Sequence, residues 1–242
     1  MLVWTRHRLW VLTLFLFSLL VLWDAMGFDL PLARLFGSAQ GFAWRNQHTV
    51  VLLMHELPRY ASGMLLALLV LGVFRPWGFL RRMVVAQRWQ LVLSIAAGLL
   101  AVSALKRLSA TSCPWSLAEF GGVAQYVSHW AWGMHDQGPG HCFPAGHASS
   151  AFAYVAGWFV LRRAAPGVAG AWLATALLIG TVLGVVQQVR GAHYMSHTLW
   201  TAWVCWAVGL AADMLAHARH YSLAADTKLS EAFRFSQNRR PR

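Results

Sequence analysis

Long apolar runs recur along this chain, and they constrain its fold more than any other feature. A helix that crosses a bilayer needs about 20 mostly apolar residues. We place runs of this kind at 9–23, 60–74, 90–105, 148–161, 168–188 and 198–216. Of the 242 residues, 58% are hydrophobic and only 12% are charged, against roughly 25% charged in an ordinary soluble domain. The sequence therefore predicts an all-α membrane protein, a bundle of six transmembrane helices.

The basic residues indicate how this bundle is oriented. Fourteen of the 20 Lys and Arg fall in segments that are cytoplasmic if the N-terminus is cytoplasmic, which is the positive-inside bias. Both termini are then cytoplasmic, and a long loop between the third and fourth helices faces outward. The net charge of +12 does not indicate nucleic-acid binding, because no soluble basic domain carries it. We expect the protein in the cytoplasmic membrane. The unusual polar residues lie in the outward segments, so we expect the functional site to face the periplasm.

The first apolar run could be read as a signal peptide, because Arg6 and Arg8 precede it. No small-residue cleavage site follows it, so we expect a retained helix. We predict one membrane domain over residues 1–221, and a basic, flexible cytoplasmic tail over 222–242. The segment 43–59 is interpreted as a short helix that only packs at the outer interface.

Two of the three cysteines, Cys113 and Cys142, belong to the long outward loop, whereas Cys205 falls inside the last apolar run. In an oxidising periplasm the two loop cysteines could form a disulfide that braces the loop. Two free buried thiols are an equally good interpretation of the sequence.

Three histidines, His147, His193 and His197, fall at predicted helix ends on the same outward face. Pro144 and Gly146 come directly before the helix that His147 begins. The N–H groups at such a helix start have no intrahelical partner and favour anions such as phosphate.

A second cluster of residues points to the same chemistry. Arg190, His193 and His197 are spaced i, i+3, i+7 and share one face if the backbone stays helical, although Gly191 could break it. A guanidinium at a bilayer edge is costly without a partner, and its planar donors suit a tetrahedral oxyanion. Snorkelling of Arg190 to the interface is the alternative. Lys106 and Arg107 add positive charge at the outer end of the third run.

These blocks resemble the type 2 phosphatidic acid phosphatase family, a superfamily that includes vanadium haloperoxidases. The family pattern is K-x6-R-P, then P-S-G-H, then S-R-x5-H-x3-D. Order, spacing and predicted topology agree over about 90–216. Lys106, His147 and His193 occupy matching positions.

The resemblance implies a mechanism for hydrolysis of a phosphate ester. His193 would attack phosphorus to form a phosphohistidine, and His147 would protonate the leaving oxygen and later activate water. The oxygens of the phosphate would be bound by Lys106, Arg190, Gly146, Ala145 and Arg107. No metal or other cofactor is implied, because these cations neutralise the phosphate.

The chain departs from the family pattern at several positions. His197 stands where the family has aspartate, Cys113 and Gln187 stand where it has arginine, and Ala145 replaces serine. His197 would then orient the nucleophile in place of the family's aspartate. An acidic residue of the outward segments could take that role instead, and the candidates are Glu119, Asp136 and Glu56. Arg107 or Arg59 could offset the arginine missing at Cys113. Asp213 is too far along its helix.

The resemblance implies a lipid phosphatase whose substrate is a lipid phosphate monoester or a polyprenyl pyrophosphate. A non-catalytic lipid-binding relative that kept the fold is the alternative, because of the changes at Cys113 and His197. A haem carrier is disfavoured, since none of the candidate histidines lies in the middle of a span. The motifs do not distinguish one lipid substrate from another.

Overall fold

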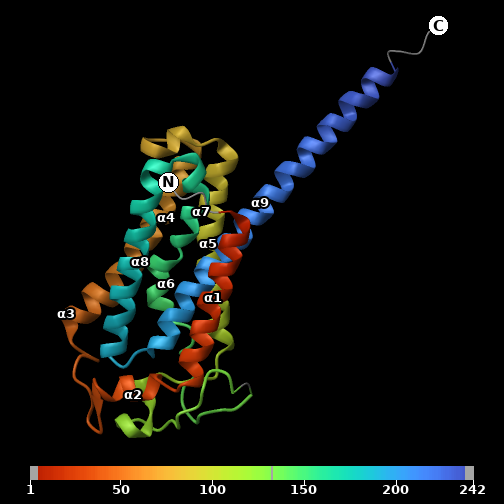
Figure 1. Ribbon diagram of the computed structural model, residues 1–242. Coiled ribbons are helices and arrows are strands. Elements are labelled where there is room, and N and C mark those ends of the chain that lie inside the picture. The colour runs from red at the N-terminus through yellow and green to blue at the C-terminus, as the bar shows by residue number, and fades with distance from the viewer. Residues whose placement is uncertain (1–4, 132, 238–242) are drawn as a thin grey trace.

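The computed structural model describes residues 5–131 and 133–237, and the side chains up to residue 218. Nearly all of its regular structure is helical (Figure 1). The α-helices are α1 Arg6–Ala25, α2 Asp29–Arg34, α3 His48–Val51, α4 Leu57–Phe74, α5 Val85–Leu108, α6 Gly146–Phe152, α7 Val155–Ala164, α8 Pro166–Val189 and α9 Met195–Gln237. The strands β1 (Gly37–Ser38) and β2 (Gly41–Phe42) form one small antiparallel hairpin.

Among the described residues, five helical segments are long and apolar enough to cross a membrane. They are Arg6–Ala25, His48–Arg82, Val85–Leu108, Pro166–Val189 and Met195–Ala218. The prediction of an all-α fold with several membrane-type helices is confirmed at this level. The predicted count of six crossings stays a prediction.

The structure differs from the prediction of a single helix over 148–161. This run is divided between α6 and α7, with a turn at Ala153 and Tyr154. Residues 151–161 are all buried, because α7 packs against α5, α8 and α9. The run is therefore apolar because it forms the centre of the bundle.

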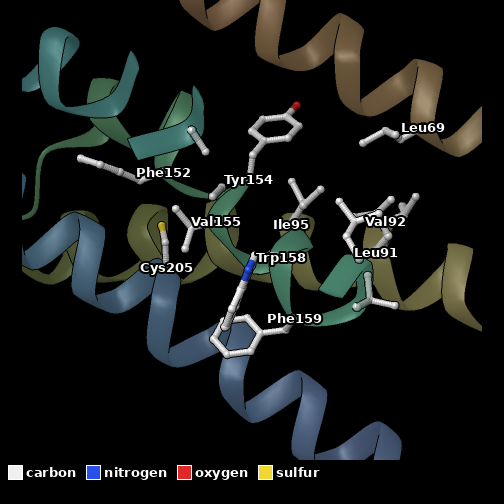
Figure 2. Packing of buried hydrophobic residues seen from close by; sticks show 14 of the residues in the cluster. Leu69, Leu91, Val92, Ile95, Phe152, Tyr154, Val155, Trp158, Phe159 and Cys205 are labelled. Carbon is white, nitrogen blue, oxygen red and sulfur yellow. The ribbon is translucent and has the colours of Figure 1, made fainter. Parts of the chain in front are cut away.

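Large side chains of this central pair fill the core, as Figure 2 shows. Phe152, Val155 and Phe159 are almost fully buried in the same cluster as Ile95 of α5 and Cys205 of α9. Burial of a large apolar side chain stabilises a fold by roughly 1.5–3 kcal/mol. This packing fixes α6 relative to α5 and α9.

The two ends of the bundle differ in character. At one end Asp213 of α9 accepts hydrogen bonds from Arg162 and Arg163 at the end of α7 and from Gln90 of α5. The opposite end carries α2, the hairpin and the long loop from 109 to 145 (Figure 1). Asp213 therefore lies at the end of the bundle away from His147, His193 and His197, as expected.

The last helix extends farther than the sequence indicated. α9 continues to Gln237, so the backbone of the tail from 222 to 237 is helical and points away from the bundle (Figure 1). Residues 238–242 of that tail lie outside the described residues. Its flexibility and its cytoplasmic position stay predictions.

Close packing of α7 on α9 gives a testable prediction. A Cβ added to Gly209 would lie 2.7 Å from Cα and 3.0 Å from Cβ of Ala156, whereas one added to Gly170 meets no atom within 4 Å. Gly209→Ala should destabilise the protein by about 1–3 kcal/mol through overpacking. Gly170→Ala is the matched control, because both substitutions add the same methyl group to a helix. Equal melting temperatures of the two variants in detergent would contradict this packing.

Candidate active site

The two histidines with the strongest sequence signal lie next to each other. His147 is in the first turn of α6, and His193 lies in the short connection between α8 and α9. Their ring centroids are 6.0 Å apart. His193 is only 2% exposed and His147 is partly buried, so both rings are shielded from bulk water.

A sharp turn delivers His193 to this position. α8 ends at Val189, and Gly191 has φ of +71°, which the glycine adopts without steric strain. The amides of Ala192 and His193 then donate to the carbonyl of Gln187 at 2.9 and 3.3 Å. The backbone breaks at Gly191, so the condition for a helix face shared by Arg190, His193 and His197 is not met. The turn still places the ring centroids of His193 and His197 5.9 Å apart.

A third histidine, His55, contacts His147 and was missed from the sequence. It lies in a π-helical turn, Leu52–Glu56, that joins α3 to α4. The Nε2 atoms of His55 and His147 are 3.0 Å apart, and Nδ1 of His147 is buried without a partner. The interpretation of segment 43–59 as a helix that only packs is therefore wrong. A histidine inside an apolar stretch, close to Arg59, was the available signal.

Arg190 is buried, at 4% exposure, with neutral partners. Its guanidinium donates to Oε1 of Gln187 at 3.0 Å and to the carbonyl of Arg45 at 2.9 Å, and its Nε is buried without a partner. Gln187, which replaces the family's arginine, thus holds the arginine that is present. Snorkelling to water is not the arrangement observed.

Lys106 is the second cation of the site. It is partly buried at the end of α5, and a Cβ added to Gly146 would lie 3.3 Å from its Cδ. In the described part of the chain, neither Lys106 nor Arg190 pairs with a carboxylate. Two cations without counter-ions beside neutral histidines form a binding place for an anion.

Two of the predicted phosphate-binding residues are placed differently. The amide of Ala145 donates to the carbonyl of His197 at 3.2 Å, so it is not free to bind phosphate. Arg107 is exposed, and its side chain leaves α5 about 100° around the helix from Lys106. Gly146 begins α6 beside Lys106, as expected.

His197 does not find a carboxylate among the three acids considered from the sequence. Glu119 pairs with Arg34 on the surface, Asp136 accepts from Ser112 and Gly138, and Glu56 is exposed. Instead, Nδ1 of His197 is 3.0 Å from the carbonyl oxygen of Cys142, and its Nε2 is buried without a partner. A backbone carbonyl therefore orients this ring.

Cys113 and Cys142 form a disulfide in the structure. The bond joins the loop after α5 to the segment that leads into α6. One sulfur of the bond, Sγ of Cys142, lies 3.5 Å from Nδ1 of His193, the candidate nucleophile. The disulfide thus braces the site where the family has an arginine.

The environment favours neutral imidazoles at the site. Burial, followed by the neighbouring His55, Lys106 and Arg190, lowers the pKa of His147 to about 3. Burial and then Lys106 also hold the pKa of His193 well below its usual value. A neutral His193 has a free nitrogen lone pair, as a nucleophile requires.

A family model described as the PAP2 superfamily matches residues 87–220, more than half of the chain. The chain belongs to the PAP2 superfamily. The match runs from α5 into α9 and includes Lys106, His147 and His193. No curated protein and no solved structure matches the chain. PAP2 members are phosphatases, so at this level the protein is a phosphoric ester hydrolase.

The low pKa of His147 predicts how stability depends on pH. The unfolded chain, with a histidine pKa near 6.5, takes up a proton before folded His147 does at about 3. The stability that neutral His147 contributes is therefore complete above pH 6.5 and is lost as the pH falls toward 3. His147→Gln should flatten the fall in melting temperature between pH 6.5 and 4. The exposed His135→Gln should behave as wild type, and parallel curves for all three proteins would refute the assignment.

Proposed function

We propose that this protein is a membrane phosphatase that hydrolyses a lipid phosphate monoester or pyrophosphate through a phosphohistidine intermediate. The observation that carries the proposal is the pair His193 and His147, whose ring centroids are 6.0 Å apart. Beside them lie Lys106 and Arg190, which pair with no carboxylate among the described residues. A neutral nucleophile, a second titratable ring and cations without counter-ions are the groups that phosphoryl transfer uses.

In the first step, a ring nitrogen of His193 attacks phosphorus in line with the bond to the leaving oxygen. That P–O bond breaks, and a proton from His147 passes to the leaving oxygen. His147 is neutral in the free protein. The negative charge of the bound phosphate raises the pKa of His147, so that the ring takes up a proton when the substrate binds.

In the second step, water attacks the phosphohistidine and the P–N bond breaks. His147, neutral again after the first step, accepts the proton of the water, and inorganic phosphate leaves. Lys106 and the free Nε–H of Arg190 stabilise the phosphoryl oxygens in both steps. The carbonyl of Cys142 holds His197 beside the nucleophile.

An apolar cavity of about 460 Å³ supports a lipid substrate. It lies between α4, α6 and α8, and its lining includes Pro58, Ser150, Tyr154, Ala171 and Leu183. Ser150 is one helical turn beyond His147 and donates to its carbonyl at 2.7 Å. The cavity is suited to the first part of a lipid tail whose phosphate lies at the histidines.

Two features support a site on the outer face of the cytoplasmic membrane. The basic residues are concentrated at the end of the bundle opposite the histidines, as the positive-inside bias requires. The disulfide lies at the histidine end, and disulfides persist in oxidising compartments such as the periplasm.

Loss of either histidine should abolish catalysis. His193→Ala and His147→Ala should reduce phosphate release from phosphatidic acid and undecaprenyl pyrophosphate in micelles by at least about 10³-fold, whereas His135→Ala should keep wild-type activity. With labelled substrate, quenching in alkaline detergent should trap a base-stable, acid-labile phosphoprotein in the wild type and none in His193→Ala. Lipid binding by the wild type without any phosphate release would favour the non-catalytic alternative and overturn the proposal.

The cavity predicts a difference between lipid and soluble substrates. Ala171→Trp places a large ring in the cavity lining, whereas Ala174→Trp lies on α8 outside it. The first variant should raise KM for phosphatidic acid about tenfold and leave hydrolysis of p-nitrophenyl phosphate unchanged, and the second should change neither. Equal loss on both substrates in Ala171→Trp would argue against a tail in this cavity.

A further inference from the structure

A second polar cluster lies at the histidine end of the bundle and takes no part in the proposed reaction. It contains Asp24 in the last turn of α1, Asp29 at the start of α2 and His129 in the long loop. One ligand atom from each residue lies within 4.8 Å of the other two. The side chains of Asp24 and His129 are each 6% exposed, and Asp29 is 5% exposed.

The hydrogen bonds of the cluster leave specific atoms unused. Asp29 accepts from Trp23 and from the amide and hydroxyl of Ser196. Oδ2 of Asp24 accepts from Trp130 and Trp200, each at 2.8 Å, whereas its Oδ1 is buried without a partner. Nε2 of His129 is 3.3 Å from Oδ2 of Asp24, an ion-pair distance when the ring is protonated. The unused oxygen of Asp24 and a ring nitrogen that faces the same carboxylate are therefore buried together.

The two carboxylates of the cluster exceed the positive charge beside them. In the regions that the structure describes, neither Asp24 nor Asp29 pairs with a lysine or arginine, and the one ion-pair partner is His129, which is charged only when protonated. Burial of two carboxylates side by side costs several kcal/mol unless a cation is present. A bound divalent ion would neutralise both carboxylates.

We infer that Asp24, Asp29 and His129 bind one divalent transition-metal ion, with Zn²⁺ and Mn²⁺ as the fitting ions. The residues line a small cavity of about 10 Å³ together with Tyr126 and Ser128, which is about the space that one small ion or water occupies. Two ligand atoms on opposite sides of such an ion lie up to about 4.3 Å apart. The ligand atoms of the cluster lie within 4.8 Å of one another, so they need to move together only slightly to bind the ion. One imidazole with two carboxylates suits Zn²⁺ or Mn²⁺ better than the oxygen-only sites of Ca²⁺.

Such an ion would act on the phosphate site through packing. The ring of His129 stacks on Phe143 at 4.1 Å and meets the edge of His197 at 5.7 Å. Phe143 precedes α6 in the segment that carries His147. The metal therefore braces α1, α2 and the long loop against the catalytic histidines, while phosphate is bound by Lys106 and Arg190.

Metal binding to the full chain, purified in detergent and treated with EDTA, tests the inference. Calorimetric titration with ZnCl₂ and with MnCl₂ should give one ion per chain and a rise in melting temperature. Asp24→Asn and His129→Ala should weaken binding by about 10–100-fold and lose the thermal shift. The exposed His135→Ala, in the same loop, is the matched control and should bind as wild type. Failure of both metals to bind wild-type protein would overturn the inference.

A second set of ligand atoms, in Cys113, Cys142 and His193, must be distinguished from this site. His193→Ala should retain the metal although the proposed function predicts that it is inactive, so the two proposals fail independently. X-ray absorption of zinc-loaded wild-type protein should show nitrogen and oxygen ligands. This measurement uses the wild type alone, so it does not depend on whether a variant folds. A sulfur shell, or loss of binding in His193→Ala, would overturn the assignment.

Discussion

The buried guanidinium of Arg190, which has no carboxylate partner among the described side chains, is the constraint on which the site depends. Gln187 and the carbonyl of Arg45 hold the group in place but leave its charge uncompensated. Burial, then His55, and then Lys106 and Arg190 depress the pKa of His147, which favours the neutral ring in the free protein. In the proposed reaction, binding of phosphate would supply both the missing counter-charge and the condition under which His147 carries a proton.

Much of the fold could be predicted from the sequence, because apolar periodicity and length decide where long helices form. The helix predicted over 168–188 is α8, Pro166–Val189, in the structure. The division of 148–161 into α6 and α7 could not be predicted, because a buried run and a lipid-facing run have the same apolar composition. The turn at Gly191 was left open, since glycine permits a positive φ but does not require it.

Several residues that the motifs singled out lie close together in the structure, although their roles stay predictions. Lys106, His147, His193 and Arg190 are close together in the structure, whereas Ala145 donates its amide elsewhere and Arg107 is exposed. His55 was missed because its contact with His147 joins residues 92 positions apart, and no local pattern reports such a contact. The same holds for Asp24, which comes from the first helix and reaches the loop only through tertiary packing.

The central position of α6 and α7 affects how the protein is assembled in the membrane. Most of their surface is covered by α5, α8 and α9, and two of these helices are synthesised later. The pair reaches its final packing only after α9 has been inserted, and His147 sits at its end. A chain that ends before α9 lacks part of the packing that holds α6, so in the proposed function catalysis would require the whole bundle.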